Sequence, residues 1–404
     1  MELPTRYLSA REAADRLGIS VATLYAYVSR GLLRSEAVDD GSRARRYYAE
    51  DVDALRSRKE MRRDPESGAQ NALSYGMPVL ESAITLIEDG RLFYRGYDAL
   101  GLAQQRSVEE VASLIWLDHL DPGDLFAQGG DAQAPAPQLE ALDAVQHPIE
   151  CYQATLARAA AGDLAAYLTA PEAMAATGAR ILARLVAATS GRAATMPVAQ
   201  ALQAAWTPER PETADLFSAA LILCADHELN VSAFTARCVA SAGSTPYAVV
   251  IAGLAALQGH RHGGHTERVG HLLREASTDI TGAVAGYLRQ GRSIPGFGHR
   301  LYPAGDPRAR LLLEMVDARN ADAALPALAS ELRRTVHALT GEQPTVDFAL
   351  EVMARTLELP PRAALALFAL GRTIGWIGHA IEQAATEQLI RPRARYVGAK
   401  VRTL

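Results

Sequence analysis

Long apolar runs are missing from this sequence, and so is the start of a secretory signal. The longest apolar run covers 11 residues, 247–257, whereas a helix needs roughly 20 to cross a bilayer. The first residues, Met-Glu-Leu-Pro-Thr-Arg, lack the basic start and the apolar stretch of a signal peptide. We therefore expect no membrane-spanning segment and a cytoplasmic location.

Lysine and cysteine are both scarce. Lys59 and Lys400 are the only lysines, so that arginine supplies the other 39 basic side chains. Three cysteines form neither a C-x-x-C pair nor an even disulfide set. This pattern predicts reduced, mostly buried thiols at Cys151, Cys224 and Cys238.

The sequence does contain enough apolar side chains for a large folded protein. Of its 404 residues 49% are hydrophobic and 22% are charged, with a net charge of −5, a composition that excludes a disordered chain. One hydrophobic core seldom organises this length, so we expect two or three domains. Residues 1–64 carry 13 basic and 11 acidic side chains, while the remainder is net negative. This difference predicts a separate first module.

The first module has the pattern of a helix-turn-helix. Ser9 and Glu12 have the spacing of a capping box, and Gly18 can end the helix that they begin. After a four-residue turn, Ser20 can cap a second helix that Gly31 stops. The order resembles the small winged helix-turn-helix domains of the mercury-resistance-regulator and excisionase type.

That resemblance implies DNA contact through the second helix and the arginine-rich segment after it. The residues concerned are Thr23, Tyr25, Arg30, Arg43, Arg45 and Arg46. A charge of only +2 is weak for a DNA-binding module. The alternative is a small adaptor fold with a solvated basic loop.

Beyond residues 65–75, which are typical of a linker, most of the chain (76–404) has a helical pattern. Residues 82–87 and 92–94 are joined across an Asp-Gly turn and predict a β-hairpin. Residues 121–138 are rich in Gly, Pro, Ala and Gln and predict a surface loop or short insert.

Six of the ten histidines lie between residues 227 and 299. His227 belongs to a polar break between two apolar helices, which is typical of a pocket wall. His262 precedes two glycines directly after an apolar helix, and glycines allow a ligand to approach the backbone closely. His299 lies in G-F-G-H-R. These positions predict a functional cluster.

Charged residues follow at helix starts and inside an apolar helix. Asp306 can cap a helix that holds Arg308 in its positive first turn. Asp347 heads another helix, Arg372 lies inside an apolar one, and Arg391 belongs to a C-terminal R-P-R. Taken singly, Asp347 also fits the role of a helix cap, and Arg372 also fits the role of a partner in a structural ion pair. The apolar helix that holds Arg372 also contains Gly371, Gly375 and Gly378, which predict close packing against other helices.

Together these motifs resemble the citrate synthase family, in order and spacing, from about residue 76 to 404. The matching pieces are Y-R-G-Y-D at 94–98, D-H-E-x-N-x-S at His227, H-G-G at His262, G-F-G-H-R at His299, D-P-R at Arg308, V-D-F at Asp347, R-T-x-G-W-I at Arg372 and R-P-R at Arg391. The resemblance implies a mainly α fold, with a large domain and a small domain of about 265–357 that closes over the substrates.

The resemblance also implies a role for each residue. To form a carbon–carbon bond from an acyl-CoA methyl group, a base removes a weakly acidic proton while a donor stabilises the enolate oxygen. Asp347 would be the base, His262 the enolate donor and His299 a catalytic contact of oxaloacetate. The implied substrate-binding residues are His227, Arg308, Arg372 and Arg391. In the family the last comes from the neighbouring subunit, which implies a homodimer. The resemblance implies neither a permanently bound cofactor nor a metal.

The sequence departs from the family pattern near the proposed acyl-CoA site. Where the family usually reads L-H-G-G-A-N, Arg261 and His265 flank the His262 motif. The segment 301–305 has no basic residue for CoA phosphates, and Glu351 follows Asp347 where the family usually has glycine. Each departure bears on acyl-CoA choice or on turnover.

Three functions fit this sequence. The first is an acyltransferase that condenses an acyl-CoA, foremost acetyl-CoA, with oxaloacetate or a related 2-oxo acid. The second is a DNA-binding regulator whose synthase-like body senses oxaloacetate, citrate or CoA esters. The third is a 2-methylcitrate synthase. A metal site at His260, His262 and His265 is a weaker alternative, because no helix fixes the geometry of their loop.

Overall fold

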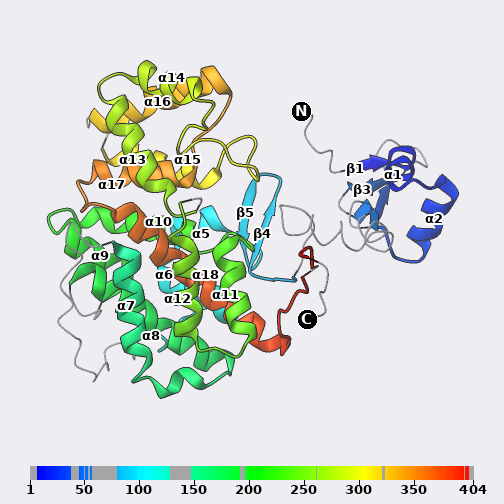
Figure 1. The fold of residues 1–404 in the computed structure, drawn as a ribbon, viewed down its shortest axis with the longest axis horizontal. Helices are drawn as coiled ribbons and strands as arrows, with labels where there is room; N and C mark the ends of the chain where they lie inside the picture. Colours follow the sequence, from blue (N-terminus) through cyan, green and yellow to red (C-terminus); the bar gives the residue numbers. More distant parts are fainter. Residues whose placement is uncertain are drawn as a thin grey trace. The chain divides into compact units, whose positions relative to one another are not determined.

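The computed structural model describes residues 7–37, 45–49, 51–52, 55–56, 80–127, 147–191, 196–260, 262–320, 324–394 and 396–399 (Figure 1). These fall into two compact units, Met1–Glu81 and Ser82–Leu404. The predicted linker, 65–75, and most of the predicted loop, 121–138, lie outside the described residues.

The smaller unit combines a three-stranded antiparallel sheet with two helices. Its elements are β1 (Tyr7–Ser9), α1 (Ala10–Leu17), α2 (Val21–Ser29), β2 (Ser35–Ala37) and β3 (Arg45–Tyr48), with β3 between β1 and β2. The predicted capping box of Ser9 and Glu12 forms, and Gly18 ends α1 in the left-handed conformation. Ser20 caps α2 as predicted. Apolar side chains from both helices and from β3 share one core.

The larger unit begins with the predicted hairpin. Strands β4 (Thr85–Glu88) and β5 (Arg91–Tyr94) pair in antiparallel register, and β6 (Tyr97–Asp98) adds a third strand. Asp89 and Gly90 between them have φ angles of 51° and 72°. A two-residue turn with positive φ at both positions matches the twist of the strands, which is why the Asp-Gly pair predicts a hairpin.

All other named elements in the described part of the larger unit are helices. They are α5 (Ala99–Gln105), α6 (Val108–Leu117), α7 (Pro148–Ala160), η2 (Leu164–Tyr167), α8 (Pro171–Ser190), α9 (Val198–Trp206), η3 (Pro211–Thr213), α10 (Ala214–Cys224), α11 (Val231–Ser241), α12 (Pro246–Leu257), α13 (His265–Ala276), α14 (Ile280–Arg289), α15 (Pro307–Arg319), α16 (Ala324–Thr340), α17 (Val346–Thr356) and α18 (Ala363–Thr386).

Helix α18 is the central helix of this unit and packs against α8, α10, α11 and α12. A Cβ atom at Gly371 or Gly375 would lie 2.5 or 2.4 Å from a carbonyl oxygen of the α10 segment, which confirms the predicted close packing. By length and composition α18 could cross a membrane, but its apolar window is entirely buried inside the protein. Its apolar surface therefore contacts other helices of the same chain.

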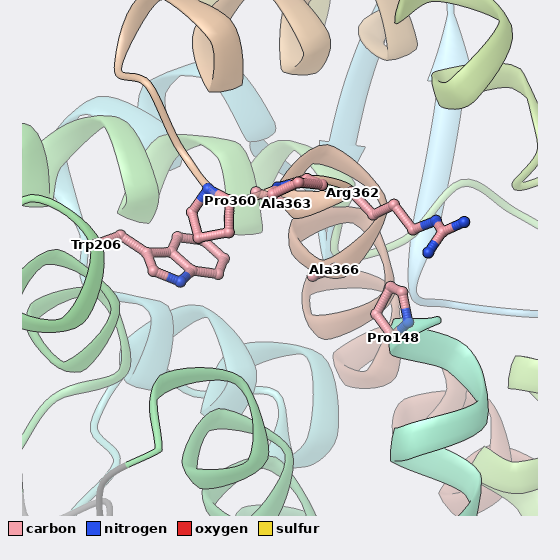
Figure 2. Close-up of a pocket in the computed structure, with 7 residues that line it drawn as sticks. Pro148, Trp206, Pro360, Arg362, Ala363 and Ala366 are labelled. Carbon is pink, nitrogen blue, oxygen red and sulfur yellow. The ribbon is translucent and has the colours of Figure 1, made fainter. Parts of the chain in front are cut away.

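Helices α13 to α17 lie together at the top of the view in Figure 1, over the residues that the resemblance predicts as a small domain. The first helix of this group follows the His262 loop, and the last one leads into α18. Figure 2 shows a small pocket of about 10 Å³ at the start of α18, lined by Trp206, Pro148 and Pro360 among others. No predicted site residue lines this pocket.

The three cysteines are free thiols, as predicted. Cys224 is buried, and Cys151 and Cys238 are partly buried. Burial raises the pKa of all three thiols, that of Cys224 to about 12. They are therefore protonated and unreactive at neutral pH.

Candidate active site

The carboxylate of Asp306 joins the starts of two helices. It caps α15 by accepting the Arg308 backbone N–H at 3.0 Å. Its other oxygen accepts the N–H of Val346, the first residue of α17, also at 3.0 Å. Backbone N–H groups at helix starts carry partial positive charge. Two such starts next to each other stabilise the Asp306 carboxylate.

Arg308 and Asp306 form a buried bidentate ion pair. The Nε and Nη2 atoms of Arg308 donate to the two carboxylate oxygens at 2.9 and 2.8 Å, and both residues are 3% exposed. Burial alone would raise the pKa of Asp306, but Arg308 outweighs it and holds the pKa below its usual value. A guanidinium has five N–H donors, so two bonds to Asp306 leave donors for a substrate carboxylate.

His227 and His299, far apart in sequence, meet around Tyr302. Their ring centroids are 5.3 Å apart, and His227 Nε2 shares a hydrogen bond of 3.0 Å with the Tyr302 hydroxyl. Sequence reasoning missed Tyr302, although it follows the G-F-G-H-R motif by two residues. Burial raises its pKa to about 12, so the phenol stays protonated.

Both histidines of this cluster are neutral at physiological pH. Burial, together with the charge of Arg308, lowers the pKa of His299 to about 4. The same two causes hold the pKa of His227 well below its ordinary value. His299 Nδ1 accepts the Leu301 N–H at 3.2 Å, so the single ring proton lies on Nε2. A neutral imidazole with Nε2–H can donate to a carbonyl oxygen without transferring charge.

His262 lies at the end of a short hydrogen-bond chain. Asn230 Oδ1 caps α11 by accepting the N–H groups of Ser232 and Ala233, so this atom is an acceptor. The Ser232 hydroxyl donates to it at 2.7 Å, and Ser232 Oγ contacts His262 Nε2 at 2.9 Å. His262 Nε2 is therefore the donor of that bond. Burial and nearby Arg372 lower the pKa of His262 to about 4.

The turn that presents His227 is anchored by Asp226. This fully buried carboxylate contacts His379 Nε2 at 3.1 Å and accepts the Thr85 hydroxyl proton at 2.6 Å. It also accepts the N–H of Glu228, whose φ of 52° places it in the left-handed region. A strained residue at this position is held only because its surroundings fix it. Neither Asp226 nor His379 was predicted as a site residue.

Arg372 and Asp347 complete the group. Arg372 is 2% exposed and donates through Nε to the Cys224 carbonyl at 2.8 Å, with its guanidinium 4.8 Å from the Phe368 ring. Asp347 is the second residue of α17 and is partly buried. Burial raises the pKa of Asp347, although His265 and Arg308 oppose the rise. A carboxylate with a raised pKa is a better proton acceptor than a solvated one.

Within one chain, Arg391 lies away from the other predicted site residues. It is exposed, and the adjacent Ile390 N–H donates to Ser241 Oγ at 3.1 Å. Ser241 is the last residue of α11 and Ser232 is its second, so the two are about 14 Å apart along the helix at 1.5 Å per residue. Arg391 therefore lies apart from the residues that surround His262.

The predicted DNA-contacting residues differ in how available they are. Tyr25, on α2, is 55% exposed, and Arg30, directly after α2, is exposed. The Thr23 hydroxyl bonds Ser20 Oγ at 2.9 Å. Arg45 donates to Ser35, and Arg46 pairs with a carboxylate oxygen of Glu36 at 3.2 Å. Arg43 lies outside the described residues. The α2 surface is thus open, whereas the β3 arginines bind within their own sheet.

Metal ligation finds no support in the described ranges. No three His, Cys, Asp or Glu side chains gather there as a metal ion would require. His262 Nε2 bonds Ser232, and His265 Nδ1 accepts a hydrogen bond from Arg268 at 3.0 Å.

Comparisons with known proteins identify the family and the fold of this chain. Residues 73–393 match the citrate synthase family (citrate synthase, C-terminal domain), and residues 7–60 match a helix-turn-helix domain. Citrate synthase from Haloferax volcanii is 31% identical over 360 residues, which cover 80% of this chain and 95% of the relative.

Solved structures show the same fold. Citrate synthase from Thermotoga maritima superposes with a TM-score of 0.69 at 27% identity, covering 81% of this chain and 96% of that one. The enzyme from Thermoplasma acidophilum, solved as a ternary complex with carboxymethyl coenzyme A and oxaloacetate, gives 0.68 at 24% identity over 81% and 96%. These matches confirm the predicted, mainly helical fold class. The chain therefore belongs to the citrate synthase family and carries a helix-turn-helix domain at its N-terminus.

Proposed function

We propose that this chain condenses an acyl-CoA, foremost acetyl-CoA, with oxaloacetate to give citrate and free CoA. The observation that carries the proposal is the meeting of two buried arginines, three neutral histidines and a carboxylate of raised pKa in one site. Cationic and neutral donors suit a small dianion, and a carboxylate suits proton abstraction. Acyl-CoA is a co-substrate in this reaction.

Oxaloacetate would bind between the arginines and the paired histidines. Arg308 and Arg372 supply forked donors for its carboxylates. His299 Nε2–H would donate to the C2 carbonyl oxygen and make the carbonyl carbon more electrophilic. Because the pKa of His299 is about 4, the ring acts as a hydrogen-bond donor and stays neutral before the attack.

Asp347 would remove a proton from the acyl-CoA methyl group. The electron pair of the C–H bond moves into the enolate, and His262 would stabilise the enolate oxygen. In the unliganded arrangement the single His262 proton lies on Nε2, toward Ser232. Donation through Nδ1 requires the other tautomer of the neutral ring, in which Nδ1 carries the proton and Nε2 accepts from the Ser232 hydroxyl.

The enolate carbon would then attack C2 of oxaloacetate and form the new carbon–carbon bond. The C2 oxygen becomes an alkoxide, which takes up a proton to give the hydroxyl group. Hydrolysis of the thioester by one water releases citrate and CoA. Closure of the region 265–357 over residues 76–264 and 358–404 would exclude bulk water until that last step.

We further propose a cytoplasmic homodimer in which Arg391 reaches the neighbouring subunit's site. The exposed position of Arg391, apart from the other site residues of its own chain, supports this. Tyr167 and Leu168 are exposed apolar side chains that line a cavity of about 270 Å³, and Leu164 in the same segment is exposed as well. A subunit interface would cover such side chains. Light scattering on the purified protein measures the mass directly.

A thiol-release assay with oxaloacetate and a small panel of acyl-CoAs tests the proposed reaction. Acetyl-CoA should release CoA, and oxaloacetate omission should abolish the release. Preference for propionyl-CoA would instead indicate a 2-methylcitrate synthase. The panel must include both acyl-CoAs, because the one methylene by which they differ changes binding by only about 1–3 kcal/mol. No release with any acyl-CoA would refute the enzyme.

The exposed α2 surface favours DNA binding as a second function of the same chain. Tyr25 on that helix and Arg30 directly after it are exposed to solvent. Suppose that binding of oxaloacetate or acyl-CoA is coupled to DNA binding. The ligand must then change the affinity of the protein for DNA by the same factor by which DNA changes the affinity of the protein for the ligand. Gel-shift titration against genomic fragments, with and without each ligand, tests this regulator. Ligand-dependent binding without thiol release would favour the regulator over the enzyme.

A further inference from the structure

Helix α18 holds the chain segment that leads into the His227 turn. Arg372 donates through Nε to the Cys224 carbonyl at 2.8 Å. About one turn later on the same face, the Gly375 N–H donates to the Ala225 carbonyl at 2.9 Å. Two consecutive residues before the turn are therefore bonded to the helix that carries a proposed substrate-binding arginine.

His379 continues this series. It follows Gly375 by four residues, about one turn, and contacts the next residue of the segment, Asp226. Its Nε2 atom lies 3.1 Å from Asp226 Oδ1, and both side chains are fully buried. Burial would raise the pKa of Asp226, but His379 and Arg372 hold it below its usual value. Asp226 is therefore an ionised carboxylate, and His379 Nε2 is the donor of this bond.

The Asp226 carboxylate also closes the turn around His227. Asp226 precedes His227, and its Oδ2 atom accepts the N–H of Glu228, which follows His227, at 3.1 Å. The same oxygen accepts the Thr85 hydroxyl proton at 2.6 Å. The φ of 52° at Glu228 is a conformation that persists only when its surroundings fix it. The position of His227 therefore depends on the groups that hold Asp226.

The other imidazole nitrogen of His379 has no such task. Among the described residues His379 Nδ1 has no hydrogen-bond partner, and the Glu382 Oε2 atom is 4.0 Å away. The ring is completely buried. His379 therefore acts on the site through its Nε2 donor and Asp226.

We propose that His379 is a positioning residue for oxaloacetate binding. Through Asp226 it fixes the His227 turn to the helix that carries Arg372, so that the imidazole and the guanidinium keep a set spacing before the substrate arrives. Such preorganisation lowers the cost of ordering both groups on binding. The proposal rests on the proposed function for the roles of His227 and Arg372.

His379→Leu removes the donor and retains a large buried side chain. We expect the Kd for oxaloacetate to rise about 10-fold in calorimetry, because His227 is no longer held in place. The KM for acyl-CoA should stay near wild type, because His262 bonds Ser232 on α11, beyond the turn. A loss of stability alone would reduce the active fraction and kcat but would leave the Kd for oxaloacetate unchanged.

His379→Gln is the rescue variant. The amide nitrogen of Gln can take the place of Nε2 and donate to Asp226, whereas nothing replaces Nδ1. The Kd for oxaloacetate should therefore be close to that of wild type. A Kd as weak as that of His379→Leu would show that the Nε2 donor is not responsible and would overturn the proposal.

Thr85→Val keeps the proposal testable if His379→Leu does not fold. It removes the hydroxyl that donates to Asp226 Oδ2, and the Kd for oxaloacetate should rise about 3-fold. The matched control is Thr373→Val, which removes a buried hydroxyl next to Arg372 that donates to the Ala369 carbonyl of its own helix at 2.9 Å. This control should bind oxaloacetate as wild type does. Equal Kd values in the two variants would argue against a role for the Asp226 contacts.

A measurement without substrate keeps this proposal distinguishable from the proposed function. In protein labelled with ¹⁵N in the histidine rings, the His227 signals are those lost in His227→Gln. They should move in His379→Leu and stay close to wild type in His379→Gln and Thr373→Val. Unmoved His227 signals in His379→Leu, or an unchanged Kd for oxaloacetate, would overturn the positioning role. If wild type neither binds oxaloacetate nor releases thiol, the proposed function fails, and the ring signals still decide whether His379 positions His227.

Discussion

Replacing Asp306 by asparagine should destabilise the larger unit strongly. Asp306 accepts two side-chain bonds from Arg308, the Arg308 backbone N–H and the Val346 N–H, at 2.8–3.0 Å. Its side chain is fully buried and that of Arg308 is 3% exposed. Removing one partner of such a pair leaves a buried charge without compensation, which costs about 3–5 kcal/mol. Urea unfolding followed by circular dichroism measures the difference.

The control for this prediction lies on the same helix. Arg319, at the end of α15, pairs with Asp215 at 3.4 Å, but the Asp215 side chain is 75% exposed. Asp215→Asn should therefore change the free energy of unfolding by less than about 1 kcal/mol. If Asp306→Asn costs no more than this control, the buried pair does not stabilise the two helix starts and the reasoning fails.

The pH dependence of the Asp306 effect has a definite sign. Burial would raise its pKa, but Arg308 holds it below the unfolded value of 3.8. A group with a lowered pKa stabilises the fold fully above its unfolded pKa and loses that contribution as the pH falls through the folded value. The difference between wild type and Asp306→Asn should thus be constant near neutrality and shrink below about pH 4.

Further predictions follow from the proposed reaction and the domain organisation. Asp347→Asn should fold and bind oxaloacetate but lower kcat at least about 100-fold; wild-type turnover would remove Asp347 from the mechanism. His299→Ala and Arg372→Ala should each weaken oxaloacetate binding in calorimetry, and unchanged affinity in both would leave these residues structural. Deletion of residues 1–64 should leave an active dimer by light scattering and thiol release, whereas a soluble but inactive dimer would make the first module part of the catalytic unit. If the module binds DNA, its site should be a palindrome, and gel-shift affinity should fall steeply with salt; a salt-independent affinity would argue against phosphate contacts.

Local features of this protein could be predicted from the sequence because their causes lie within a few residues. The Ser9 capping box depends on groups three residues apart. The hairpin depends on two residues that tolerate positive φ. The motifs around His227, His262 and His299 resemble a known family closely enough to identify the fold class without coordinates. Their order along the chain carried that information.

The tertiary structure alone decided which side chains meet. Tyr302, three residues after His299, contacts His227 only because segments 75 residues apart in the sequence fold together, and sequence spacing does not predict such a contact. The hydrogen bond from the Val346 N–H, at the start of α17, to Asp306 could likewise not be predicted, because the two residues are 40 positions apart in the sequence. His265 stood out in the sequence as a departure from the family pattern, but its neighbours were unknown.

Electrostatic character was decided in the same way. Nothing in the sequence indicates that His299 and His262 are neutral, because burial and nearby arginines lower their pKa values to about 4. The sequence by itself thus determined the helices, the turns and the family, which depend on short-range backbone and side-chain preferences. Burial, long-range pairing and the resulting pKa values depend on desolvation by residues from the whole chain, and so only the folded structure could decide them.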